Sequence, residues 1–216
     1  IKLHRVLELE PANVDAHIRA GTFAMKDGRW EEAFIAWGLV RRLYPGHSTA
    51  SLYLAQTLLA MQRPAAARPL LQEYMECMDE TAGIDERVEV AGLLLDTGEP
   101  VMASKLLDQL CDELDNNDPR RIRCLRLLAV AQFSSGNIDD GAAVSRKVLR
   151  VDSKCIASIH NLALAAITNQ RYRSAWGWLR RGLAIDPLDN DLRRLRTRLV
   201  MEGVAKFLRK LIGRQQ

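Results

Sequence analysis

Histidine and cysteine are the side chains of this sequence best suited to acid–base, nucleophilic or metal chemistry. The histidines are scattered along the chain, at His4, His17, His47 and His160. The cysteines form no CxxC pair and lie at or near apolar helical positions: Cys77, Cys111, Cys124 and Cys155. No Cys/His group has the spacing of zinc ligands, so we expect neither a metal site nor a cofactor. The cysteine pattern predicts buried, reduced thiols in a reducing compartment.

Carboxylate pairs could serve general acid–base catalysis, but their context favours solvated helix ends and turns. The two runs are Asp112-Glu113-Asp115 and Asp139-Asp140. His160 could shuttle a proton, although an ordinary polar residue of a binding surface is the favoured interpretation. The sequence contains no HExxH, GxSxG, GxGxxG or GxxxxGK[ST] motif. We therefore predict no catalytic residues and no enzymatic activity.

Two clusters of basic side chains offer a different chemistry, the binding of anions. Residues 190–216 have a net charge of +6 in a chain whose total is +4. We call seven of their cations the basic-helix residues: Arg193, Arg194, Arg196, Arg198, Lys206, Arg209 and Lys210. The second cluster follows the acidic residues 112–118 and consists of Arg120, Arg121, Arg123 and Arg126. It either balances that acidic loop or anchors an anionic peptide through planar guanidinium groups.

The sequence repeats with a period of 34 residues, and the repeated units must position these side chains. Pro11 and Pro45 are 34 residues apart, and so are Ser153 and Pro187. Each closes a similar phrase: LELEP, RRLYP, LRVDS and LAIDP. A fixed period of this length indicates stacked supersecondary units. With 48% apolar residues the chain can bury a sizeable core, and no run of 18 apolar residues predicts a membrane span.

The clearest unit runs from residue 14 to residue 47. Apolar residues recur at helical spacing until Lys26-Asp27-Gly28, and a second helical pattern begins at Trp30 and ends at Pro45. This predicts an antiparallel pair of helices joined by a short turn. Gly21 and Ala33 fall where the two helices must touch, because larger side chains there would push them apart.

These units resemble the tetratricopeptide repeat, whose pattern is a large residue, a Leu-Gly or Ala pair, Tyr, Ala, an aromatic and Pro. In the first unit those places hold His17, Ala20, Gly21, Ala24, Ala33, Trp37 and Pro45. The small pair, the later aromatic and the proline match, whereas His17 and Ala24 depart from the pattern. The fifth unit repeats it with Leu162-Ala163, Tyr172, Ala175 and Pro187. The resemblance implies an all-α fold, a right-handed α-solenoid of stacked antiparallel helix pairs that forms a superhelix.

The repeats divide nearly the whole chain. Residues 1–13 are predicted to be the second helix of a truncated repeat, and residues 190–216 a basic C-terminal helix that caps the stack. The five repeats between them cover residues 14–47, 48–84, 85–121, 122–155 and 156–189. Repeats two and three are the loosest matches, and three-residue additions fall in their loops.

The resemblance also implies where a partner binds. First helices of successive repeats line a concave groove, which suits an extended or helical segment of another protein. The family pattern predicts these groove residues: Arg19, Thr22, Met25, Tyr53, Gln56, Arg123, Arg126, Val130, Phe133, His160, Asn161 and Leu164. A subclass of the family grips a C-terminal carboxylate with an Asn, Asn, Lys and Arg set. Its sixth-place Asn occurs here once, as Asn161, so we do not expect that clamp.

The sequence therefore predicts a non-catalytic scaffold for protein–protein interaction and complex assembly, in the cytoplasm because the cysteines look reduced and no targeting signal opens the chain. One alternative is docking on anionic lipid or nucleic acid through the basic-helix residues. It is less favoured because the apolar face of that helix is expected to cover the fifth repeat. Another alternative is a regulatory segment of a larger enzyme. Self-association through the apolar ends of an open stack is a separate option.

Overall fold

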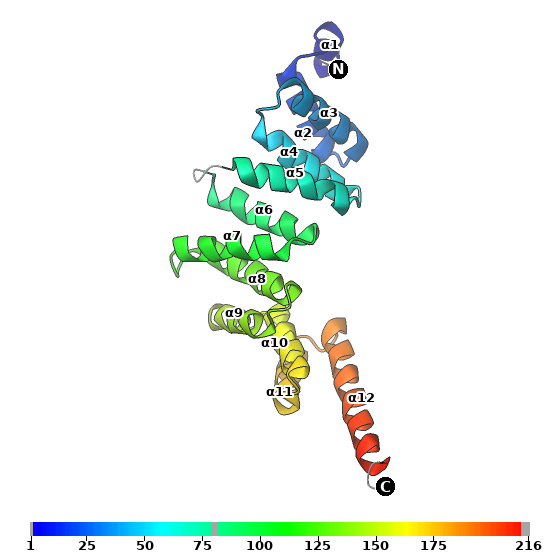
Figure 1. Ribbon diagram of the computed structural model, residues 1–216, viewed down its shortest axis with the longest axis vertical. Coiled ribbons are helices and arrows are strands. Elements are labelled where there is room, and N and C mark those ends of the chain that lie inside the picture. The colour runs from blue at the N-terminus through cyan, green and yellow to red at the C-terminus, as the bar shows by residue number, and fades with distance from the viewer. Residues whose placement is uncertain (1, 79–81, 213–216) are drawn as a thin grey trace. The chain divides into compact units, whose positions relative to one another are not determined.

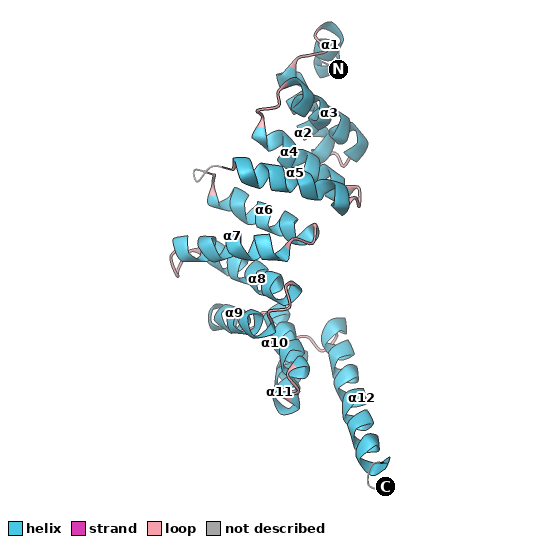
Figure 2. Cartoon of the chain, in the orientation of Figure 1, coloured by secondary structure: helices cyan, strands magenta, loops and turns pink. Residues whose placement is uncertain are grey.

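The structure is a computed structural model that describes the backbone of residues 2–78 and 82–212, and the side chains within them except those of residues 2–4, 48 and 204–212. The described chain is helical throughout and contains no strand (Figures 1 and 2). The first six helices are α1 (Lys2–Leu9), α2 (Val14–Lys26), α3 (Trp30–Leu43), α4 (Ser48–Ala60), α5 (Pro64–Cys77) and α6 (Ile84–Asp96). The next six are α7 (Pro100–Glu113), α8 (Pro119–Ser134), α9 (Ile138–Val151), α10 (Ile156–Thr168), α11 (Tyr172–Ile185) and α12 (Asn190–Ile212).

Consecutive helices pack as antiparallel pairs, which confirms the predicted all-α class. Close packing joins α2 to α3, α4 to α5, α8 to α9, and α10 to α11. The chain forms two compact units, Ile1–Leu106 and Leu107–Gln216, and their boundary lies within α7. That boundary falls inside the third of the predicted repeats, whose limits stay a prediction.

The start of α8 shows how local chemistry sets a helix boundary. The sequence pattern places the fourth repeat at residue 122, but α8 begins at Pro119. Asp118 precedes it and accepts a hydrogen bond from the backbone N–H of Arg120 at 2.8 Å. An acidic N-cap followed by proline at the first position starts a helix efficiently, because the ring presets φ and the missing N–H needs no partner.

The turn inside each helix pair requires one residue in the left-handed region. Gly28, Gly98 and Gly136 have φ of 71°, 78° and 82° there. Gln62 and Gln170 adopt the same conformation in the remaining two pairs, with φ of 59° and 55°. Glycine reaches this region without a steric cost, whereas a residue with a Cβ loses about 1 kcal/mol. Two of the five turns are therefore locally strained.

The core of the first unit is organised around Trp37, whose side chain is 1% exposed. Its ring stacks on Tyr53 with 4.5 Å between centroids, and its Nε1 donates to Met25 Sδ at 3.2 Å. Gly21 lies against the same ring, where an added Cβ would approach Nε1 to 2.6 Å. His17 is also buried, and its Nε2 lies 2.8 Å from the Pro11 carbonyl oxygen. The two departures from the family pattern on α2, His17 and Ala24, are thus both core residues.

In the second unit, the N-terminal part of α12 packs on α10 and α11. Leu192, Leu195 and Leu199 are buried in one apolar cluster with residues of those helices, including Ile167 and Leu179. Gly182 allows the approach, because a Cβ there would lie 2.5 Å from Leu192 Cδ1. The predicted covering of the fifth repeat is therefore seen for these leucines, whereas the side chains of Val204, Leu208 and Leu211 lie outside the described residues.

We predict that Gly21→Ala destabilises the protein by about 1–3 kcal/mol, because the new methyl group overlaps the buried Trp37 ring. Gly92 is the matched control. It occupies the equivalent place on α6, but an added Cβ there meets nothing within 4 Å. Gly92→Ala should leave stability unchanged or raise it by up to about 1 kcal/mol through helix propensity. Thermal denaturation followed by circular dichroism distinguishes the two, and equal changes would contradict the packing argument.

Relief of the strained turns should stabilise the fold. We expect Gln170→Gly to raise the free energy of unfolding by about 1 kcal/mol, because glycine tolerates the left-handed conformation. The reverse change is Gly136→Ala, at a position where an added Cβ has open space and only the backbone conformation matters. It should lower stability by a similar amount in urea denaturation. Effects of the same sign for both variants would show that the turn conformation is not the cause.

The packing of α12 yields a third prediction. Leu199→Ala should cost about 2–5 kcal/mol, because it leaves a cavity among buried apolar side chains. Met201, two residues further along and 64% exposed, provides the control, and Met201→Ala should change stability by less than about 0.5 kcal/mol. Amide hydrogen exchange of residues 190–200 measures this local stability. Unchanged protection in Leu199→Ala would mean that α12 does not depend on this contact.

Candidate functional site

In the first unit, most of the predicted groove residues have partners within the fold. Met25 and Tyr53 both pack on Trp37, and the Thr22 hydroxyl donates to the Ile18 carbonyl at 2.8 Å. Gln56 Nε2 donates to Glu89 Oε1 at 2.9 Å, which links α4 to α6. Arg19 remains exposed. Met25 and Tyr53 therefore hold the core as well as lying on first helices.

In the second unit, the predicted residues form one stripe on each of two first helices, and Arg126 and Val130 stand at the register of His160 and Leu164. On α8 they are Arg123, Arg126 and Val130, which are spaced i, i+3, i+7 and exposed, Val130 by 46%. On α10 the stripe is half-buried and consists of His160, Asn161 and Leu164. Both helices pack on α9. The structure thus presents cationic, apolar and amide side chains on two first helices of one compact unit.

Phe133 differs from the other predicted residues of α8. Its ring is half-buried and lies against Gly141 of α9, where an added Cβ would approach Phe133 Cδ2 to 2.7 Å. This close contact makes the ring a spacer between the two helices. Leu164 is likewise packed at the edge of the apolar cluster of α10, α11 and α12. Substitution of Phe133 would consequently affect packing as well as any binding face.

The arginine cluster of α8 is largely balanced within the chain. Arg126 Nη2 lies 2.6 Å from Asp152 Oδ2, and Arg120 pairs with Asp118 at 2.7 Å. The hydrogen bonds from Arg120 lower the pKa of Asp118 below its ordinary value. Arg121 donates to the carbonyl oxygens of Cys111 and Leu114 at the end of α7, where helix carbonyls lack partners.

Arg123 is the exception in that cluster. Its side chain is exposed, and among the described residues no ion pair engages it. It is therefore the guanidinium of α8 best placed to meet an anionic group from outside the chain.

The basic-helix residues are also partly engaged. Arg194 lies 3.5 Å from Asp191, Arg198 lies 2.9 Å from Glu202, and Arg193 Nε donates to the Pro187 carbonyl at 2.9 Å. Arg196 instead lines a pocket between α11 and α12. The side chains of Lys206, Arg209 and Lys210 lie outside the described residues.

The four cysteines differ in exposure. Cys111, Cys124 and Cys155 are buried and unpaired, and burial raises the pKa of Cys111 to about 11, so the thiol is protonated at neutral pH. The prediction of burial is wrong for Cys77, which is exposed because it is the last residue of α5 and lies beyond that helix's buried face. Within residues 2–78 and 82–212 no cluster of His, Cys, Asp and Glu could hold a metal ion.

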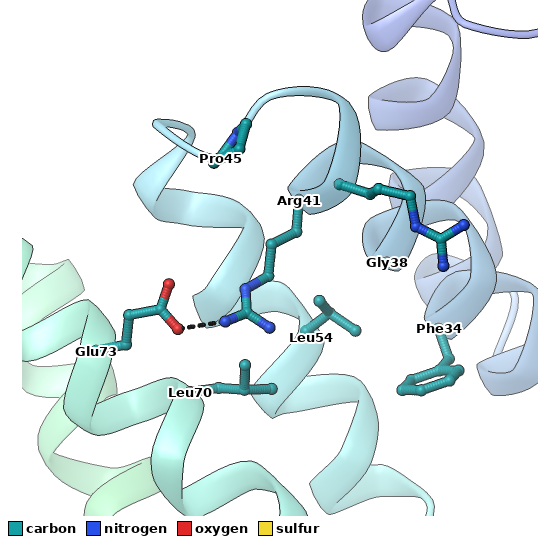
Figure 3. Close-up of a pocket in the computed structure, with 8 residues that line it drawn as sticks. Phe34, Gly38, Arg41, Pro45, Leu54, Leu70 and Glu73 are labelled. Atoms are coloured by element: carbon teal, nitrogen blue, oxygen red, sulfur yellow. Dashed lines mark hydrogen bonds and ion pairs between the residues drawn. The ribbon is translucent and has the colours of Figure 1, made fainter.

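A pocket of about 490 Å³ lies in the first unit where α3 and α4 meet α5. Figure 3 shows Phe34 and Arg41 of α3 and Leu54 of α4 on one side, with Leu70 and Glu73 of α5 on the other. Arg41 Nη2 lies 2.6 Å from Glu73 Oε2 across the opening. The pocket thus has apolar side chains at its base, and the Arg41–Glu73 ion pair at its opening connects α3 to α5 of the next repeat.

A pocket of about 650 Å³ lies in the second unit between α11 and α12. Its lining combines apolar residues with arginines and contains no carboxylate: Arg173, Trp176, Gly177, Leu179, Arg180, Leu183, Ala184 and Arg196. Trp176 is 44% exposed. The sequence pattern indicated only Arg196 of this set. The missed residues lie on a second helix, which the family pattern treats as structural, although the TrpGlyTrp sequence of α11 was a visible signal.

Solved structures with the same fold support this description. YrrB, a TPR protein with an unusual peptide-binding site, matches with a TM-score of 0.73 at 14% identity, over 90% of this chain and 97% of that one. MamA 41-end from Desulfovibrio magneticus RS-1 gives 0.66 at 12% identity, over 82% of this chain and 97% of that one. PilW, a type IV pilus biogenesis factor, gives 0.64 at 13% identity, over 89% and 87%.

No protein-family model and no curated protein matches the sequence. Identities this low establish the fold alone. No helix of the described chain has the length and apolar character needed to cross a membrane. Antiparallel helix pairs, small residues at the helix contacts and the likeness to YrrB agree, and the chain therefore has the tetratricopeptide-repeat fold.

Proposed function

We propose that this chain is a non-catalytic interaction scaffold that binds a segment of a partner protein on the face formed by the exposed stripe of α8 and the half-buried stripe of α10. The observation that carries the proposal is the matched pair of stripes on these helices. Arg123, Arg126 and Val130 of α8 stand at the register of Ala157, His160 and Leu164 of α10. A repeated face that combines apolar area with a few polar groups suits recognition of an extended or helical peptide.

The charge balance of this face indicates what its partner carries. Arg123 is exposed, and the Arg126–Asp152 pair is a surface pair that contributes at most about 1 kcal/mol. Both guanidinium groups can therefore turn to a carboxylate on a partner at little cost. Val130, 46% exposed, supplies apolar area on the same helix, one turn beyond Arg126. A segment with an apolar side chain beside an acidic one fits this arrangement.

The basic-helix alternative has less support. The described arginines of α12 other than Arg196 already contact Asp191, Glu202 or the Pro187 carbonyl. The α12 leucines that would enter a lipid surface, Leu192, Leu195 and Leu199, are buried against α10 and α11. Among the structural neighbours, YrrB is described as having a peptide-binding site, which agrees with a peptide-binding role. Cytoplasmic location and complex assembly stay predictions.

Substitution of the α8 face tests the proposal. Arg123→Glu with Val130→Ala should abolish capture of the partner from a source lysate while the circular dichroism spectrum stays unchanged, because both side chains are exposed. The matched control is Arg146→Glu with Val151→Ala, which makes the same chemical changes on the exposed face of α9. A captured protein lost only with the α8 variant supports binding at this face. Identical captures by all three proteins would refute it.

A further inference from the structure

The pocket of Figure 3 and the α11/α12 pocket occupy equivalent positions in two different repeats. Helices α3 and α11 are both 14 residues long, and their first residues are 142 positions apart in the sequence. The first residues of α4 and α12 are separated by the same 142 positions. With that offset, Phe34, Gly38, Arg41, Arg42 and Leu54 correspond to Trp176, Arg180, Leu183, Ala184 and Arg196. All ten residues line the respective pockets.

The two places differ in what covers them. Over α3 and α4 lies α5, which contributes Leu70 and Glu73 to the pocket wall. Over α11 and α12 the described chain places no such helix, because α12 continues to Ile212 for 23 residues whereas α4 ends after 13. We call the α11/α12 pocket the seat, because the equivalent pocket of the first unit is covered by a helix, α5.

The chemistry of the empty seat specifies a helix unlike α5. Trp176 and Leu183 supply apolar area at the floor. Arg173, Arg180 and Arg196 surround it, no carboxylate lies in the lining, and within the described residues none of the three has an ion pair. A helix that packs here must therefore bring its own carboxylates, just as Glu73 does for Arg41.

We propose that the α11/α12 pocket binds an acidic amphipathic helix of a partner protein, with an apolar side chain and carboxylates three or four residues apart. This surface is separate from the α8/α10 face, so the proposal does not rest on that one. Complementary charge fixes the orientation of such a helix, and the floor of Trp176 and Leu183 provides apolar contact.

A second copy of this chain fits the seat poorly. Helix α1 is the second-helix equivalent at the other end of the described chain, and two 34-residue periods place Arg5 of α1 at the position of Glu73 of α5. Arg5 is paired with Glu8 at 2.9 Å, so this place on α1 offers the three arginines of the seat an arginine and no unpaired carboxylate, and like charges that face each other across an interface disfavour association. The charges thus favour an acidic partner over self-association.

The α5 sequence supplies the probe, because α5 occupies the equivalent seat. We would use a fluorescein-labelled peptide of residues 64–77 with Ala66→Glu, Pro69→Ala and Cys77→Glu, stapled on its opposite face because short helices are marginal in water. The substitutions place carboxylates on the face of Leu70 and Glu73. Fluorescence anisotropy with the full chain should show binding that weakens as salt increases.

Three comparisons decide the outcome. The double variant Arg180→Glu with Arg196→Glu should weaken binding of the acidic peptide at least tenfold. A second peptide, with lysines in place of the glutamates at positions 66, 73 and 77, should bind this variant better than it binds the wild type. Arg171→Glu with Arg194→Glu changes the net charge equally outside the pocket lining and should have little effect. The α8 variant Arg123→Glu with Val130→Ala should bind the acidic peptide normally, which separates this proposal from the proposed function.

Equal loss of binding with both arginine pairs would overturn the proposal, because it would indicate general attraction to a basic tail. Absence of salt-sensitive binding to the wild-type chain would also overturn it and leave α12 as a polar cap. Sedimentation of the chain alone provides the last check. We expect a monomer, and a dimer that Arg180→Glu with Arg196→Glu dissolves would assign the seat to a second copy instead.

Discussion

The fold depends on small residues at the points where paired helices cross. Gly21 against the Trp37 ring, Gly141 against Phe133 and Gly182 against Leu192 and Ile159 each leave no room for a Cβ without a shift of the neighbour. Ala33 and Ala175, both fully buried, occupy the place of Gly141 in the first and fifth repeats. Because these contacts are steric, they fix how far apart two helices lie and therefore which side chains reach the surface between repeats.

The same crossings explain why some predicted binding residues became packing residues. The Trp37 ring fills the space beside Gly21. Tyr53 stacks on this ring, and Met25 Sδ accepts a hydrogen bond from its indole N–H. The Phe133 ring likewise packs in the space beside Gly141. A position that the family pattern assigns to a groove is thus left exposed only where its side chain is not used in packing against the paired helix. On α8 and α10, Arg123, Arg126 and Val130 remain exposed, and His160 and Asn161 remain half-buried.

The pairing of charges follows the same geometry. Arg41 and Glu73 meet because α5 packs beside α3, and Arg126 meets Asp152 because α9 ends beside α8. Where no helix follows in the described chain, as over α11 and α12, the pocket arginines are left without carboxylates. In a stack of repeats each interface has a definite set of partners, so the same place in two repeats differs in charge according to the helix that packs on it.

The sequence alone determined the helix pairs, their period and the small residues at the crossings, because these follow from local periodicity, from glycine and proline, and from repetition. It did not show that Gln62 and Gln170 take the left-handed turn conformation, since no residue type there demands it. It could not show that Arg126 faces Asp152, that Cys77 is exposed, or that Trp176 and three arginines share one pocket. Those facts depend on how side chains far apart in sequence meet, and only the packing of whole helices against one another decides that.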